Sequence, residues 1–136
     1  MLTKAEFADR LKNACLSVIS AEAELTEIDA KFGDADHGFT MAKVCKAIIA
    51  AIDDSDGGIQ TMLDDAAMAV MAINGGSAVP LWNTWLDGLQ EHSVAADSMT
   101  VEQVKEMLEE LRNENVILGT KTIINWDKAN TEIVTA

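Results

Sequence analysis

Apolar residues in this chain recur every three or four positions, and almost no stretch alternates apolar with polar residues as a half-buried strand does. Pro80 is the only proline, so no other residue rigidly interrupts a helix. Hydrophobic residues make up 49% of the 136-residue chain, which suits a folded domain rather than a disordered segment. These features predict an all-α fold, an antiparallel bundle of about six helices in a single domain over residues 1–136.

Capping signals place the helices along the chain. Thr3 with Glu6 forms a capping box, and Thr100 with Gln103 forms another, each just ahead of an apolar periodic stretch. Pro80 suits the first turn of a helix, where its missing N–H costs nothing. Helices are therefore expected from Thr3 to about 24, from the turn at 33–38 to about 52, at 59–73, at 80–89 and from Thr100 to about 116, with a loop at 53–58 and a last short helix in the tail.

The charge balance narrows the class of partner. With 10 basic and 23 acidic residues, the formal charge of −13 argues against nucleic acid or an anionic membrane, and is compatible with metal cations or a basic protein. No apolar run approaches the roughly 20 residues of a membrane span, and the N-terminus lacks the apolar core of a signal peptide. Cys15 and Cys45 lie in unrelated contexts, which favours buried, reduced thiols over a disulfide or metal pair. A cytoplasmic location is therefore expected.

Three carboxylates crowd one short stretch, at Asp29, Asp34 and Asp36, and alternate with glycine and small residues. Such carboxylates repel one another unless a cation lies between them, and Mg²⁺ prefers oxygen ligands while keeping positions for phosphate oxygens. The following helix N-terminus also favours an anion. The pattern therefore indicates a metal–phosphate site. The alternative is that Asp34 or Asp36 caps the next helix and the other carboxylates are simply solvated.

The remaining polar motifs carry weaker signals. His37 either contacts a phosphate or lies passively on its helix. The sequence "NGGSA", 74–78, offers close backbone approach to a phosphate and the hydroxyl of Ser77, but Gly75 equally suits a helix C-cap. The polar turn "LGTKT", 118–122, has no chemical signature in isolation. No pattern of Ser, His and Asp or of Cys and His indicates a catalytic nucleophile.

Taken together, these motifs resemble the nucleotide-binding L subunit of dihydroxyacetone kinase, whose fold is an all-helical barrel. Its first motif, L-[DE]-x-x-[IF]-G-D-x-D-H-G-x-x-M, is matched by "IDAKFGDADHGFTM", residues 28–41. Its second, G-G-[AS]-S-G-P-L-[YFW]-G-T, is matched in part by "GGSAVPLWNT", 75–84, and its third, G-D-K-T-M, by "GTKTI", 119–123. The order and spacing of the motifs agree over essentially the whole chain.

The resemblance implies a site for an adenine nucleotide, ADP or ATP. Two Mg²⁺ ions would bridge its phosphates, held by Asp29, Asp34 and Asp36. The residues implied to border the nucleotide are His37 and Thr40 beside the phosphates, Gly76 and Ser77 opposite them, and Leu118, Gly119 and Thr122 at the adenine. In family members coupled to the phosphotransferase system, bound ADP receives a phosphoryl group from a phosphocarrier protein. It then passes the group to dihydroxyacetone on a separate K subunit.

The chain departs from the family pattern in three places. Ala78 and Val79 stand where the family has serine and glycine, and Thr120 replaces an aspartate. Family members also continue through further helices, which this chain lacks, so an open barrel would need cover from a partner or from a second copy in a homo-oligomer. Two functions are therefore expected: a working phosphotransfer subunit, or a non-catalytic relative with a regulatory or partner-binding role.

Overall fold

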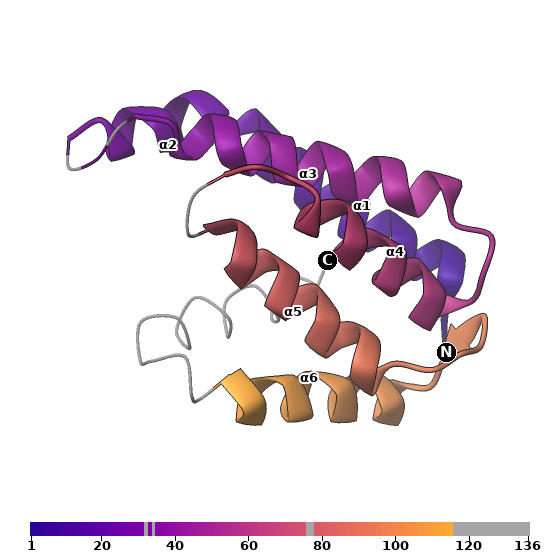
Figure 1. Cartoon of the computed structure of the whole chain (residues 1–136). Helices are drawn as coiled ribbons and strands as arrows, with labels where there is room; N and C mark the ends of the chain where they lie inside the picture. Colours follow the sequence, from indigo (N-terminus) through magenta and orange to yellow (C-terminus); the bar gives the residue numbers. More distant parts are fainter. Residues whose placement is uncertain (32, 34, 76–77, 116–136) are drawn as a thin grey trace.

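The computed structural model describes residues 1–31, 33, 35–75 and 78–115. The regular structure of this part of the chain is helical apart from one pair of two-residue strands (Figure 1). The predicted all-α class is therefore confirmed, whereas the single domain over 1–136 stays a prediction. In chain order the elements are β1 (Leu2–Thr3), α1 (Lys4–Ser20), α2 (Glu22–Asp29), α3 (His37–Asp54), α4 (Ile59–Met71), α5 (Ala78–His92), β2 (Ser98–Met99) and α6 (Val101–Asn115).

Helix α3 lies at the centre of the packing, in contact with α1, α2 and α4, while α5 packs on α4 and α6 packs on α5 (Figure 1). Helices α4 and α5 run antiparallel. The side-chain amide of Gln60 donates to the Gln90 carbonyl over 3.2 Å, and that of Asn83 donates to the Ala67 carbonyl over 2.8 Å. The fully buried side chains come from five helices and from β2, and they include Phe7, Leu11, Ile48, Ile59, Met62, Leu63, Leu86, Leu89, Met99, Met107 and Leu111.

Both predicted capping boxes are present. The N–H of Glu6 donates to Thr3 Oγ1 over 3.2 Å, and the Thr3 N–H donates to Glu6 Oε1 over 3.3 Å. Thr100 and Gln103 make the same reciprocal pair over 2.8 and 3.1 Å. The two capped segments lie side by side, so that Leu2 pairs with Met99 and Thr3 with Ser98. This strand pair was not predicted, because an extended segment of two residues has no periodicity that a sequence pattern can reveal.

The predicted end of the first helix, near Glu24, was wrong. The first helix ends at Ser20, and after Ala21 the second helix, α2, continues to Asp29. Ser17 donates its hydroxyl to the Asn13 carbonyl, and Ser20 donates to the Ser17 carbonyl. Such back-bonding competes with the helical ladder and bends helices. The loop predicted at 53–58 begins later, because α3 extends to Asp54. Pro80 lies in the first turn of α5 as predicted, and the predicted tail helix falls outside the described residues.

Candidate functional site

Two of the three predicted carboxylates, Asp29 and Asp36, flank the turn that joins α2 to α3, which forms one end of the molecule (Figure 1). Asp29 is the last residue of α2, and Asp36 immediately precedes α3. Asp34 lies outside the described residues. Asp36 and His37 are exposed, so this turn presents its polar groups to solvent.

Asp29 caps α3 from across the turn. Its Oδ2 accepts the backbone N–H groups of Asp36 over 3.1 Å and of His37 over 3.3 Å. Asp36 occupies the N-cap position, yet its side chain makes no capping hydrogen bond to the described first turn of α3. The interpretation of Asp36 as the capping side chain was therefore wrong. Sequence reasoning missed the cap because the acceptor lies seven residues before the position where a cap is normally sought.

The backbone of the turn is shaped around that carboxylate. The Gly33 N–H donates to the Asp29 carbonyl over 2.6 Å, and a Cβ at position 33 would lie 2.5 Å from Asp29 Oδ1. Ala35 has φ of 62°, in the left-handed region that a side chain with Cβ adopts at a cost. Glycine at 33 and the turn at 35 thus let the chain wrap closely about the Asp29 side chain.

Gly38 allows α2 and α3 to approach each other closely. A Cβ at this buried position would collide with the Glu22 carbonyl oxygen and with the hydroxyl of Thr26. The approach positions the end of α2, and with it Asp29, over the N-terminus of α3. The sequence contains this signal as the glycine of "DHG", but only the structure shows that its reason is helix packing.

The second motif meets the first at Thr40. A Cβ on Gly75 would lie 3.3 Å from Thr40 Cγ2 and 2.9 Å from Val79 Cγ2, so the turn after α4 rests on the first turn of α3. Thr40 is buried there, and its N–H donates to the Asp36 carbonyl over 2.9 Å. Val79 belongs to the hydrophobic core, so its side chain, which replaces the glycine of the family pattern, lies largely inside the protein. The structure therefore brings together two motifs that are about 35 positions apart in the chain.

Other predicted site residues stay untested. Gly76 and Ser77 of the second motif, and Leu118, Gly119 and Thr122 of the third, lie outside the described residues. Within the described part of the chain, no group of three His, Cys, Asp or Glu side chains is close enough to hold a metal ion. That search could not include Asp34, so the aspartate triad stays a prediction.

Comparison with known families decides which family this chain belongs to. Residues 31–126 match the model of the DAK2 domain, well over half of the chain. The chain belongs to the DAK2 domain family. The match begins two residues after Asp29 and includes Asp34, Asp36 and His37. It also includes the second motif, 75–84, and the third motif, 119–123.

A curated relative of this DAK2 domain is DhaL of Escherichia coli strain K12, the ADP-binding subunit of a PEP-dependent dihydroxyacetone kinase. The two sequences are 32% identical over 97 residues, which cover 68% of this chain and 45% of DhaL. The chain thus spans less than half the length of that relative. The family resemblance inferred from the three motifs is confirmed.

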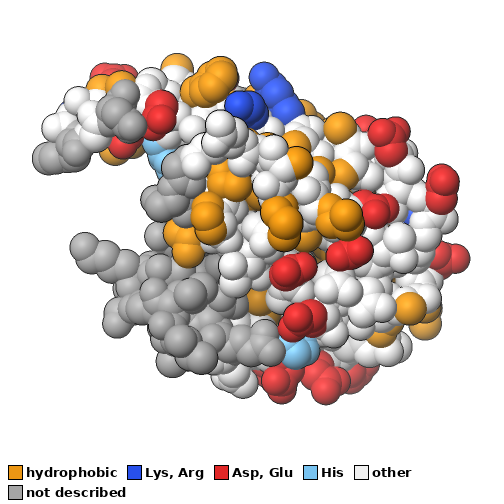
Figure 2. All heavy atoms as spheres, viewed as in Figure 1, with side chains coloured by type: hydrophobic (Ala, Val, Ile, Leu, Met, Phe, Trp, Pro, Cys, Tyr) orange, Lys and Arg blue, Asp and Glu red, His pale blue; other side chains and the backbone are white. Residues whose placement is uncertain are grey.

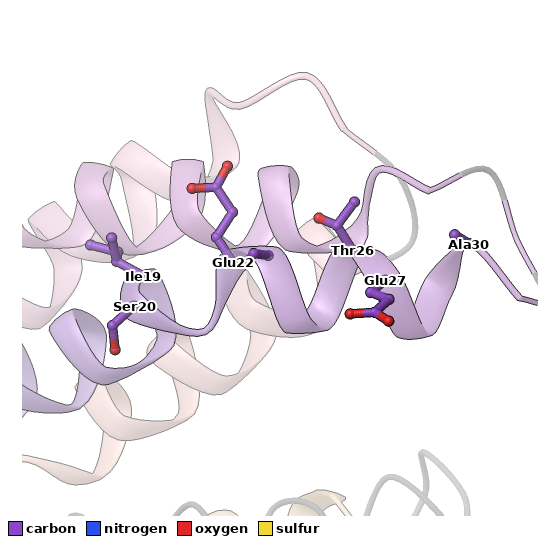
Figure 3. A pocket seen from close by; sticks show the side chains of 7 residues that line it. Ile19, Ser20, Glu22, Thr26, Glu27 and Ala30 are labelled. Carbon is purple, nitrogen blue, oxygen red and sulfur yellow. The ribbon is translucent and has the colours of Figure 1, made fainter.

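A separate open pocket of about 650 Å³ runs along α2 and the end of α1 (Figure 3). It is lined by Ile19, Ser20, Glu22, Ala23, Thr26, Glu27 and Ala30. In the close view Glu22 and Thr26 point to one side of the helix and Glu27 points to the other, so the polar groups do not converge on a ligand. We assign no site there. Among the described helices of this DAK2 domain, none is long and apolar enough to cross a membrane.

Proposed function

We propose that this DAK2 domain is the nucleotide-binding phosphotransfer subunit of a dihydroxyacetone kinase. It uses ADP or ATP with Mg²⁺ to relay a phosphoryl group to dihydroxyacetone on a separate K subunit, and a phosphocarrier protein supplies the group when ADP is the resident nucleotide. One observation carries the proposal: Asp29 accepts the N–H groups at the start of α3, and the glycine turn at Gly75 rests on Thr40 in the first turn of the same helix. Both motifs thus meet at the N-terminus of α3, as a site shared between them requires.

The chemistry of the donors fits Mg²⁺. Asp29, Asp34 and Asp36 supply carboxylate oxygens, which hard cations prefer, on a turn whose described part is open to solvent. Carboxylates placed beside a nucleotide phosphate repel it, and a cation between the two offsets that repulsion. When bound, Mg²⁺ supplies the charge neutralisation that phosphoryl transfer depends on.

The protein's own contribution is to position the groups. Asp29 already accepts two N–H groups at the start of α3, which fixes one of its oxygens and the direction of the turn. In the proposal His37 and Thr40 lie beside the phosphates, and Gly76 and Ser77 approach them from the second motif. Leu118, Gly119 and Thr122 border the adenine. No side chain acts as a nucleophile, because positioning and charge neutralisation carry most of this reaction.

The second candidate function is a non-catalytic relative that binds a partner and regulates it. Ala78 favours it, because this half-buried residue begins α5 without the hydroxyl that the family has there. A transfer assay separates the two functions. A working subunit moves a phosphoryl group to dihydroxyacetone in the presence of a K subunit, whereas the regulatory protein binds its partner without transfer.

The proposed metal site is tested with the double substitution Asp34→Asn and Asp36→Asn. We expect it to abolish Mg²⁺-dependent ADP binding, because neutral amides replace two anionic ligands. The matched control is Asp56→Asn with Asp97→Asn, which removes the same two charges from exposed positions away from the site. Isothermal titration calorimetry measures the ADP affinity of both variants. Unchanged ADP affinity in the first variant contradicts the proposed metal site. Equal losses of affinity in both variants would mean that net charge, and not this site, determines ADP binding.

A further inference from the structure

An exposed apolar surface lies where α4 ends and α5 begins. Met68 and Met71 stand one helical turn apart on α4, and their side chains are 62% and 65% exposed. Ala72 and Pro80 are also exposed. The antiparallel packing of α4 and α5 brings the first turn of α5 towards the last turn of α4 and so places Pro80 near this surface. Figure 2 shows apolar side chains gathered over this part of the two helices. We call these four residues the methionine patch.

Acidic side chains flank the patch on the side away from the nucleotide turn. Asp64 and Asp65 lie one turn before Met68 on α4, and both are partly exposed. Asp87 and Glu91 follow on α5, at the level that the contact between Gln60 and Gln90 fixes. Figure 2 shows acidic groups next to the gathered apolar side chains. These four residues form the acidic flank, and the described part of α4 and α5 carries no lysine or arginine to offset them.

The methionine patch lies close along the chain to the second glycine motif of the candidate site. Met71 ends α4, four residues before Gly75, and Gly75 rests on Thr40 in the first turn of α3. A protein seated on the patch would therefore lie against the edge of the proposed nucleotide site. A phosphotransfer subunit needs such a neighbour, because it has to bring its nucleotide to a substrate held on another chain.

We propose that the methionine patch and the acidic flank form the docking surface for the substrate-carrying subunit, which presents apolar side chains beside lysine or arginine. This inference rests on the proposed function. Methionine side chains adapt to the shape of a partner, and a charged rim selects and steers a partner of opposite charge. A second copy of this chain, with its own charge of −13, meets repulsion at the same rim. A phosphorylated carrier protein brings further negative charge to this rim and is disfavoured for the same reason. The substrate on the K subunit, dihydroxyacetone, is neutral and adds no such repulsion.

The test uses the full chain and the dihydroxyacetone-loaded K subunit of the same organism as the probe. The variant Met68→Gln with Met71→Gln keeps helix propensity and removes the apolar surface. The matched control, Leu16→Gln with Val101→Gln, changes two exposed apolar residues on α1 and α6. We expect the patch variant to lose at least about tenfold in affinity for the K subunit, as a central apolar contact does. The control should bind as the wild type does.

A second variant tests the acidic flank. Asp64→Asn with Asp65→Asn should slow association with the K subunit and flatten its dependence on salt, because a steering charge acts mainly on the association rate. Unchanged binding by the methionine variant overturns the proposal. So does a wild-type chain that binds no K subunit, or a loss confined to the phosphocarrier or to self-association measured by light scattering.

ADP titration of the same variants separates this inference from the proposed function. Both variants should bind ADP with Mg²⁺ as the wild type does, because their substitutions lie outside the nucleotide motifs. If the wild type binds the K subunit through the patch but binds no ADP, the docking surface stands and the proposed function fails. If it binds ADP normally and the patch variant still binds the K subunit, the docking surface is overturned alone.

Discussion

The two ends of this helical domain are built differently. At the end that holds the N-terminus, backbone hydrogen bonds tie neighbouring elements together. The Lys4 N–H donates to the Asp97 carbonyl over 2.6 Å, and the Ile59 N–H donates to the Ala96 carbonyl over 2.9 Å. The Lys4 ammonium reaches the Ser55 carbonyl over 2.9 Å. We call this the fastened end, because α1, α3, α4 and the strand pair are all joined there.

At the site end, helix α2 has no buried residue and packs mainly on α3, with a small contact to α1. At the turn between α2 and α3, the start of α3 is held by one carboxylate, that of Asp29, which accepts two N–H groups. Ala35 adds a left-handed residue to the same turn. Several hydrogen bonds thus join the elements at the fastened end, whereas at the site end Asp29 and Asp36 lie on a turn that is partly exposed to solvent. We therefore expect substitutions at the fastened end to cost more stability than substitutions at the site end.

The largest expected effect separates the two ends directly. Phe7 is 2% exposed at the fastened end, and Ile28 on α2 is 52% exposed. Phe7→Ala should lower the free energy of unfolding by about 3–5 kcal/mol, because it opens a cavity in the core. Ile28→Ala should change it by less than about 0.5 kcal/mol. Urea denaturation measures the free energy of unfolding of both variants. Equal losses would contradict the difference in stability between the two ends.

Gly38→Ala should be the most damaging change at the site end. A Cβ there meets the Glu22 backbone oxygen, which cannot move without shifting α2, so we expect a loss of about 1–3 kcal/mol in spite of the better helix propensity of alanine. Gly88→Ala is the comparison in α5, since its Cβ meets side-chain atoms of Leu111 and no backbone atom. Thermal unfolding of both variants checks the order, and a smaller loss in Gly38→Ala would contradict the close approach of α2 and α3.

Substitutions at Asp29 should sharpen the distinction between holding the turn and holding a cation. Asp29→Ala removes the acceptor for two N–H groups and should cost about 1 kcal/mol of stability, as other caps do. Asp29→Asn keeps an oxygen acceptor, so it should cost less while still weakening Mg²⁺-dependent ADP binding. Unfolding and ADP titration on the same two variants provide both readings. Asp29→Asn with normal ADP affinity would leave Asp29 with only its capping role.

The smallest expected effect is a pH dependence at the fastened end. The hydrogen bond from Thr3 holds the pKa of Glu6 below its ordinary value of 4.5. Because the folded-state pKa is lowered, the stabilisation is present above the ordinary pKa and is lost as the pH falls through the lowered one. The stability difference between wild type and Thr3→Ala should therefore narrow below about pH 4.5. A difference that stays constant down to pH 3 would contradict the role of the ionised Glu6 in this cap.

Periodicity and capping signals predicted the regular parts of the fold well. Thr3, Glu6, Thr100 and Gln103 form the two boxes that the sequence indicates, because a capping box is a local interaction within four residues. The break at Ala21 was missed, because the apolar pattern runs on across it and the cause is hydroxyl back-bonding by Ser17 and Ser20. The strand pair depends on two segments that are distant in sequence.

The sequence offers the candidate site as a list of residues, which stays a prediction, but it does not offer their arrangement. The spacing of the aspartates indicates a cation site, and the motifs identify the family, now confirmed over residues 31–126. Neither reveals that Asp29 caps α3 or that Gly75 rests on Thr40, because both contacts depend on how helices pack. Non-local contacts of this kind leave no signature in one sequence.

The most direct test of the account is calorimetric titration of ADP into the full chain, first with Mg²⁺ and then with EDTA. We expect saturable binding with Mg²⁺ and loss of that binding in EDTA, because a cation has to lie between the carboxylates and the phosphates. Absence of ADP binding in the presence of Mg²⁺, or equal affinity with and without EDTA, would contradict the proposal that the aspartates hold a metal–nucleotide complex.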